Sequence, residues 1–453
     1  MDEYDAQFIG GDDGCNKGGA DMDQWPAERV VDLYGLDLST TPEAAEHYNE
    51  ALGRILRLES DAHAPLLAAV ASDPSFAMGH ATLAVLGHEF GTDSDTQAHF
   101  DRAVAVLDGT SERERLFIEA YSHRLSGDFD FLLSYLRAHP RDVLGISIAM
   151  PTIAFSGAYD VPEDAWLALE EMAPHFDDDW WFSGLMAFAR QDQGRMDEAR
   201  ELAEHSLGLE PRGGNAAHAA AHVYFETGQH DEGLAWIDHW ISDAGQDSTH
   251  RCHFSWHAAL YELALDKTDA VVARYQRELA PPTVVGIRAL VDASSLLWRF
   301  MVEQVDHDGC DPQAVIAAAG PTAFSPTTPF AVMHAAVAQA TVGDERALAA
   351  LATRCAASAD PVMAGTMVTL IEGLQCYLAG DMSAAADAMV SIRSALTPIG
   401  GSYAQREVVL DTAISALIAA RRGTEAAALL EQRLARRARP RDLILLDRAS
   451  AAR

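Results

Sequence analysis

A unit of two short amphipathic helices joined by a glycine turn recurs along this chain, and it limits the fold more than any other feature. From Trp180 to Pro211, apolar side chains follow helical spacing on both sides of Gly194. Gly228 stands 34 residues later, in a second unit of the same pattern. Glycine suits such a turn because the backbone reverses there in a conformation that a Cβ disfavours. The period is that of tetratricopeptide repeats, whose unit is a helix–turn–helix pair.

Weaker copies of the unit lie on both sides of these two. Their turns fall at Gly127, Asp266–Lys267, Gly380 and Gly423. Sustained alternation of apolar and polar residues, the mark of half-buried strands, is scarce. A single helix pair cannot bury its own apolar face, so such units stack. The sequence therefore predicts an all-α protein, a tetratricopeptide-type α-solenoid of helix–turn–helix pairs.

The domain organisation follows from where the helical pattern begins. Residues 1–24 are rich in Gly and Asp and hold few apolar anchors, so we expect a flexible tail. Helical periodicity starts after Trp25–Pro26 and continues without a long linker. We predict one continuous helical repeat domain over residues 25–445.

Charge and targeting signals narrow the function classes. The formal net charge is -35, which repels phosphate backbones and anionic lipid surfaces, so neither nucleic acid nor a membrane is an expected partner. The one basic run, EQRLARRARPRD near the C-terminus, is expected to form an arginine face that pairs with the acidic body of the protein or with water, and nucleic-acid binding is the less favoured alternative. The acidic N-terminus does not resemble a signal peptide, and the five cysteines are scattered, so a cytoplasmic location is predicted.

Two histidine pairs occupy equivalent positions in adjacent units. His218 and His222 are four residues apart, and so are His253 and His257, which places each pair on one helical face. The pairs are offset by 35 residues, about one repeat. Because equivalent helices of adjacent repeats pack about 8–10 Å apart, we expect four imidazoles to converge on the concave surface.

Three interpretations of the histidines remain open. They are packing residues hydrogen-bonded to neighbours; or general acids and bases of a small-molecule pocket; or four nitrogen ligands of a divalent metal ion, since an i,i+4 pair suits one ion. No cofactor is required by the sequence. One further repeat leads to Arg288, a candidate anchor for a carboxylate or phosphate, and to Asp292, a candidate to orient a histidine, as is Glu262. Trp256 and Arg406 are further candidate substrate-binding residues.

Several strings resemble the tetratricopeptide repeat protein 38 family. They are GLDLSTTPEAAEHYNEAL, DPSFAMGHA, HAAAHVYFETGQHDEGLAWI, CHFSWHAALYEL, VDASSLLWRFMVE and GGSYAQREVV. They run in one order from about residue 35 to 410, roughly four-fifths of the chain. The resemblance implies a helical repeat fold and lends no biochemical activity.

The function that the sequence favours is a histidine-lined concave pocket that binds and transforms a small molecule by acid–base or metal-assisted chemistry. The alternative is a non-catalytic scaffold that holds a protein or peptide partner, as grooves of repeat proteins often do. The residue pattern does not fix the substrate, the reaction, the metal or the oligomeric state.

Overall fold

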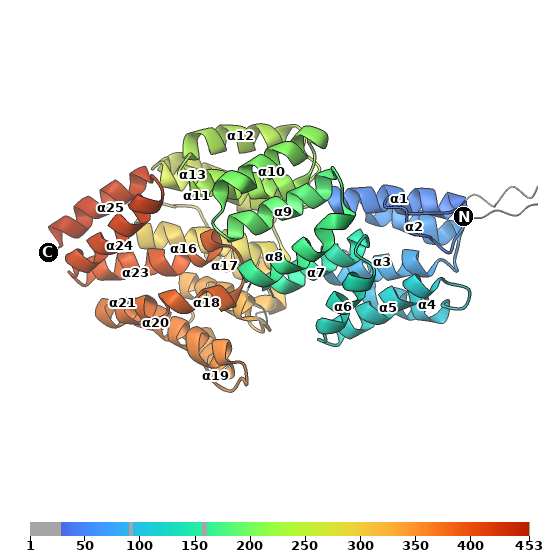
Figure 1. Ribbon diagram of the computed structural model, residues 1–453. Coiled ribbons are helices and arrows are strands. Elements are labelled where there is room, and N and C mark those ends of the chain that lie inside the picture. Colours follow the sequence, from blue (N-terminus) through green and yellow to red (C-terminus); the bar gives the residue numbers. More distant parts are fainter. Residues whose placement is uncertain (1–28, 90–93, 156–160, 453) are drawn as a thin grey trace, which may run out of the picture.

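Helices are the only extended regular structure in the residues that the computed structural model describes, which are 29–89, 94–155 and 161–452 (Figure 1). In these ranges, β-structure is limited to two isolated bridges, Val31 with Asp37 and Glu59 with Ser248. The prediction of an all-α protein is therefore confirmed. The predicted tail, residues 1–24, lies outside the described residues.

The N-terminal part consists of short helices that pack against their neighbours in sequence. These are α1 (Pro42–Arg57), α2 (His63–Ser72), α3 (Ala77–Glu89), α4 (Thr96–Ala105), α5 (Glu112–Leu125), α6 (Asp130–Ala138), α7 (Val143–Phe155), α8 (Val161–Met172) and the short 3-10 turn η1 (Ala173–His175).

The middle part includes the two strongest sequence units. It contains α9 (Trp180–Asp192), α10 (Met196–Leu209), α11 (Gly214–Glu226), α12 (His230–Ser242), α13 (Arg251–Ala264), α14 (Thr268–Arg274), the π-helix η2 (Tyr275–Leu279), α15 (Gly286–Arg288), the π-helix η3 (Ala289–Ala293) and α16 (Ser294–Glu303).

The C-terminal part completes the chain. It contains α17 (Pro312–Ala319), η4 (Gly320–Ala323), α18 (Pro329–Val342), α19 (Glu345–Ala356), the π-helix η5 (Val362–Met367), α20 (Val368–Leu378), α21 (Met382–Ser391), η6 (Arg393–Ala395), η7 (Thr397–Ile399), α22 (Tyr403–Arg406), α23 (Val408–Ala419), α24 (Gly423–Arg436) and α25 (Pro440–Ala451).

The predicted turns are present in the middle part. Gly194 and Gly228 have φ angles of 76° and 74°, the left-handed conformation that glycine adopts without steric cost. Asp266, at the turn of the next unit, has φ 59°. Each turn joins two packed helices, α9 to α10, α11 to α12 and α13 to α14. The first helices also pack on one another, α9 on α11 and α11 on α13, which brings equivalent positions of adjacent units together.

One glycine sets the distance between α9 and α11. A Cβ built at Gly184 would lie 3.1 Å from the backbone nitrogen of Ala216 and 3.3 Å from its Cβ. Glycine therefore permits a close approach of the two helices. This approach matters for the site because α9 also presents Phe188 to the histidines of α11, described below.

Buried side chains form two large clusters and one small one. The first large cluster runs from Leu38 to Ala189, and the second from Ala217 to Ala449. The small cluster consists of Ala187, Ala203 and Ala219, which belong to α9, α10 and α11. The N-terminal part also contacts the middle part directly, since the Thr249 amide donates to the Leu58 carbonyl at 2.8 Å. The prediction of one domain over residues 25–445 stays a prediction.

The C-terminal helices pack back onto the middle part, where α23 lies beside α16 and α25 contacts α13 (Figure 1). Arg433 pairs with Asp442 at 2.6 Å, and Arg439 pairs with Glu303 at 2.6 Å. We name the linked groups the C-terminal ion-pair network. Its members are Arg299, Arg433, Arg436, Arg437, Arg439, Arg441, Glu226, Asp266, Glu303, Glu407, Asp411 and Asp442.

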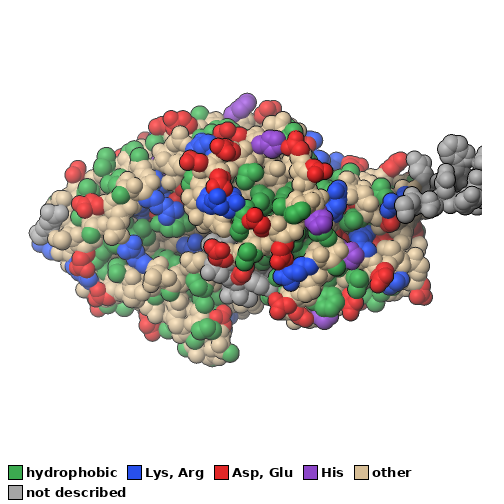
Figure 2. All heavy atoms as spheres, viewed as in Figure 1, with side chains coloured by type: hydrophobic (Ala, Val, Ile, Leu, Met, Phe, Trp, Pro, Cys, Tyr) green, Lys and Arg blue, Asp and Glu red, His purple; other side chains and the backbone are tan. Residues whose placement is uncertain are grey.

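The network explains the basic run of the sequence. Most of its arginines belong to that run, and they meet carboxylates of α11, α16, α23 and α25. The prediction that the run pairs with the acidic body is confirmed. On the visible face of Figure 2, acidic side chains are spread widely instead of gathering in one patch. None of the helices in the described ranges is long and apolar enough to cross a bilayer.

Substitution within the network tests its contribution to stability. Asp442→Asn removes one carboxylate from the buried Arg433 and Arg439, which keep Asp411 and Glu303 as partners, and we expect the free energy of unfolding to fall by about 3 kcal/mol, the lower end of the range for a broken buried pair. Asp231→Asn removes the exposed partner of Lys267 and is expected to cost less than about 1 kcal/mol. Urea denaturation of both variants measures the difference, and equal losses would contradict the structure.

Candidate functional site

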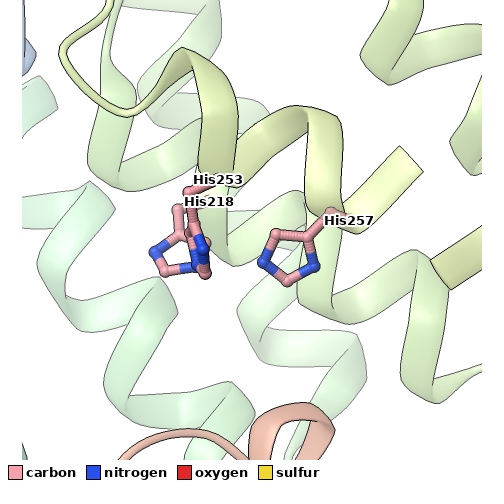
Figure 3. A group of neighbouring side chains, drawn as sticks. All are labelled: His218, His253 and His257. Atoms are coloured by element: carbon pink, nitrogen blue, oxygen red, sulfur yellow. The ribbon is translucent and has the colours of Figure 1, made fainter. Parts of the chain in front are cut away.

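The four histidines lie together on α11 and α13. His218 and His222 are one turn apart on α11, and their ring centroids are 4.8 Å apart. His253 and His257 have the same separation, 4.8 Å, on α13. Across the helices, the centroids of His222 and His257 are 4.6 Å apart. In Figure 3 the side chains of His218 and His253 overlap in the view, and the ring of His257 lies beside them. We name these four residues the histidine cluster.

Ring nitrogens of the cluster point at one another. The Nε2 atom of His218 lies 3.1 Å from Nε2 of His253 and 3.2 Å from Nε2 of His222. One nitrogen from each of His218, His253 and His257 lies within 4.8 Å of those of the other two, the spacing of a potential metal site. An imidazole nitrogen has either one proton or one lone pair. His218 Nε2 therefore cannot form a full linear hydrogen bond with both neighbours at once.

Asp292 fixes the orientation of His253. Its Oδ1 atom lies 2.8 Å from Nδ1 of His253, and both side chains are buried. Asp292 belongs to the π-helix η3, an irregularity that often marks functional positions. Burial alone raises the pKa of the Asp292 carboxyl, but contact with His253 and the nearby Arg288 lower it below its usual value. The carboxylate accepts the Nδ1 proton of His253, so its Nε2 atom is the ring nitrogen that faces the cluster.

Several nitrogens of the cluster are buried without a hydrogen-bond partner among the described residues. They are Nδ1 of His222 and both ring nitrogens of His257, whose side chain is 0% exposed. An unsatisfied buried polar group costs about 1–3 kcal/mol, so native proteins seldom retain one without a bound water or ion. These nitrogens are therefore candidates to bind an ion or a water molecule.

Three imidazoles of the cluster, those of His218, His222 and His257, have a lowered pKa and are therefore neutral near pH 7. Burial lowers the pKa of His222 to about 3, with a smaller effect of His253. Burial and the neighbouring imidazoles lower the pKa of His218 and His257 well below the usual value. Neutral imidazole is the form that coordinates metal ions.

One side of the cluster is less enclosed. His218 is partly exposed, whereas His222, His253 and His257 are at most 3% exposed. The Arg288 side chain is 29% exposed, and its Nη1 atom lies 3.7 Å from Oδ2 of Asp292. The histidines thus do not line an open groove wall, as the sequence pattern suggested, but form a buried cluster with one accessible edge.

The remaining sequence candidates fall in different places. Trp256 is fully buried, stacks on His253 with centroids 5.3 Å apart, and donates Nε1 to Ser295 at 3.2 Å, so it supports the cluster from the core. Arg406 donates Nη1 to the carbonyl of Gly400 at 3.1 Å. Glu262 pairs with Arg274 at 2.9 Å, so Asp292 and not Glu262 orients a histidine of the cluster.

Three neighbours of the cluster were not found from the sequence. Phe188 of α9 packs against His218 with centroids 4.9 Å apart. His250 precedes α13, and the pKa of its imidazole is lowered well below the usual value by burial, then by Arg288 and His253. His334 of α18 is fully buried close to Asp292, and burial lowers its pKa to about 3. His250 stands three residues before His253 and extends the same stripe, a signal that was available. His334 has no such repeat-related spacing.

No protein-family model matches this chain. A function is therefore inferred from the arrangement of the histidine cluster and the groups around it. Catalytic, substrate-binding and metal-binding roles for the residues named from the sequence stay predictions.

The carboxyl of Asp192, at the end of α9 and near Arg406, allows a test of whether this part of the structure is buried. Burial raises the pKa of its carboxyl to about 7, although Arg406 and Gln191 oppose the shift. Because the folded protein favours the protonated carboxyl, this group contributes fully to stability at a pH below about 4, the pKa of the carboxyl in the unfolded chain. The contribution is lost as the pH rises towards 7, the pKa in the folded protein.

We expect Asp192→Asn to be more stable than the wild type at pH 8 and to lose that advantage at pH 4. Urea denaturation at both pH values measures the difference. Asp197→Asn on the exposed start of α10 serves as the control, because its effect should change little with pH. The same difference at both pH values for Asp192→Asn would contradict the burial of this carboxyl.

Proposed function

We propose that this protein binds a divalent transition metal ion of the zinc type through His218, His253 and His257, and that it acts there on a small anionic molecule. The observation that supports the proposal most directly is the convergence of ring nitrogens from four histidines, three of them buried, with several of these nitrogens lacking a hydrogen-bond partner among the described residues.

The spacing of the nitrogens suits such an ion. Zinc–nitrogen bonds of 2.0–2.1 Å in a tetrahedral site place neighbouring ligand nitrogens about 3.3 Å apart. Nε2 of His218 and Nε2 of His253 are 3.1 Å apart, close to that separation. Small rotations of the rings would bring His257 to the same point, since its nitrogen is within 4.8 Å of the other two. Three histidines with a further position left for a ligand are typical of catalytic zinc sites.

Asp292 supplies the outer support that metal-bound histidines usually have. A carboxylate behind a ligating imidazole fixes its tautomer and raises its basicity. Asp292 occupies this position behind His253, at 2.8 Å from Nδ1. A histidine that served only as packing would not need its second nitrogen held free, facing two other imidazoles.

Acid–base chemistry without a metal is the less favoured interpretation. A general base works best when its pKa lies near the working pH. Burial instead lowers the pKa of His222 to about 3, far from neutral pH. A neutral imidazole of low basicity is a weak proton acceptor but remains a good metal ligand when the ion contributes its own charge.

The chain's own residues supply the rest of the site. A bound zinc-type ion would provide Lewis acidity and lower the pKa of a bound water to about 7. His222, whose Nε2 lies 3.2 Å from Nε2 of His218, would be close enough to such an ion to hydrogen-bond to a molecule bound to it. Arg288 lies beside Asp292 with its side chain 29% exposed, and its guanidinium would be available to hold a carboxylate or phosphate of the substrate.

The repeat architecture and the family are part of the same proposal. Alternating contacts of α9, α10, α11, α12 and α13, with left-handed turns at Gly194 and Gly228, support a tetratricopeptide-type solenoid. The strings quoted above support membership in the tetratricopeptide repeat protein 38 family. Both features would place the histidine cluster on the inner face of stacked first helices.

Metal content tests the proposal. Purified protein incubated with Zn²⁺ and then dialysed is expected to retain about one ion per chain. His253→Ala and His257→Ala remove a ligand and should retain little, whereas His222→Ala leaves three ligands and should retain most. His239→Ala, an exposed histidine on α12, is the matched control and should behave as the wild type. Mass spectrometry of metals measures each, with circular dichroism to check folding. A wild type that retains no more metal than His257→Ala would contradict the proposal.

The support of Asp292 gives a second prediction. Asp292→Asn frees the tautomer of His253 and should weaken zinc affinity by about 10–100-fold. Competition against a chromophoric chelator measures the affinity. Arg288→Gln, on the other side of Asp292, should leave zinc affinity within about threefold of the wild type, since Arg288 has no proposed role as a ligand. Unchanged affinity in Asp292→Asn would mean that this carboxylate serves packing alone.

A further inference from the structure

A cavity lies away from the histidine cluster, among α16, α20, α21, α23, α24 and α25. Its volume is about 190 Å³. An engineered cavity of about 150 Å³ already holds a benzene-sized molecule, so this space suits an apolar body of about six to eight carbons. None of its lining residues belongs to the histidine cluster.

Apolar side chains form about half of the lining of the cavity. Val302 of α16, Ile414 and Ile418 of α23 and Leu445 of α25 face it. Two hydroxyl groups interrupt this surface, those of Tyr377 and Ser415, which lie 2.8 Å apart and hydrogen-bond to each other. Such a lining, apolar side chains together with polar groups, is found in small-molecule sites.

The C-terminal ion-pair network borders the cavity but is electrically balanced. It joins six arginines to six carboxylates. Glu303, Asp411 and Arg433 reach the cavity wall, and each is already engaged with partners inside the network. These charges therefore have little capacity left for a ligand.

Arg448 is the exception. It lines the cavity and is partly exposed. Its Nη1 atom donates to two neutral oxygens, the carbonyl of Glu303 at 3.4 Å and Oε1 of Gln304 at 3.2 Å. Within the described part of the chain, no carboxylate lies at ion-pair distance from its guanidinium. In a protein of net charge -35, an arginine left over beside an apolar cavity is an available anion site.

We propose that this cavity binds a small carboxylic acid with an apolar body, whose carboxylate pairs with Arg448 while the body lies against Ile414, Ile418 and Leu445. The guanidinium presents parallel N–H groups, which match a carboxylate in a bidentate pair. The aliphatic wall takes the apolar part out of water. This site is independent of the metal centre, because it shares no residue with it.

Octanoate is the probe for the test, and octanol is its uncharged counterpart. Isothermal titration calorimetry is expected to show octanoate binding to the wild-type chain, about tenfold weaker binding to Arg448→Gln, and near-wild-type binding to Arg448→Lys, which retains the charge. Ile418→Trp fills the cavity and should abolish binding. Arg346→Gln, an exposed arginine on α19, is the matched control and should leave binding unchanged.

Octanol separates the two parts of the site. It should bind the wild type and Arg448→Gln equally, because it engages only the apolar wall. Equal affinity of octanoate for the wild type and Arg448→Gln would overturn the assignment of the carboxylate to Arg448. Equal affinity for the wild type and Ile418→Trp, or no octanoate binding at millimolar concentration, would overturn the cavity as the binding site.

Discussion

The packing of α11 against α13 is the contact on which the site depends. The two helices hold equivalent places in adjacent repeats, and each has two histidines four residues apart on one helical face. The packing of the helices brings these two faces together. His218 thereby meets His253, with Nε2 atoms 3.1 Å apart, and His222 meets His257. Gly184 brings α9 close behind α11, so that Phe188 closes another side. A helical repeat thus produces a convergent group of nitrogens that no single helix could form.

The C-terminal helices also hold this arrangement in place, through ion pairs with α11 and α16. Glu226 stands one turn after His222 on α11 and pairs with Arg437 at 3.1 Å, while Arg299 of α16 pairs with Asp411 at 3.0 Å. Replacing such buried pairs by apolar residues can be neutral for stability, but breaking one leaves a buried charge unpaired. The network therefore fixes one registry of the C-terminal helices on α11 and α16. The helices that carry the cluster and Asp292 are held in place as a consequence.

The sequence predicted the features that depend on the spacing of residues along the chain. It missed the features that depend on how helices distant in sequence pack together. The glycine turns, the all-helical structure and the meeting of the four imidazoles follow from periods of four and about 35 residues. The same period of about 35 residues, counted from His257, also pointed to Asp292. The depth of burial was not predicted, because it depends on helices far away in sequence, such as α18 with His334. Arg406 also lies apart from the ring contacts of the cluster, its guanidinium held by the Gly400 carbonyl. The cytoplasmic location, the absence of nucleic acid and membrane partners, and the choice between a small-molecule and a peptide partner stay predictions.

The most direct test of the proposed metal centre is X-ray absorption spectroscopy of the zinc-loaded protein at the zinc edge. The account predicts a first shell of nitrogen or oxygen at about 2.0–2.1 Å with the multiple-scattering signature of three imidazoles, and two imidazoles in His253→Ala if any metal is retained. A spectrum without imidazole scattering would place the ion elsewhere on the chain. It would leave the histidine cluster as a packing feature and contradict the central claim.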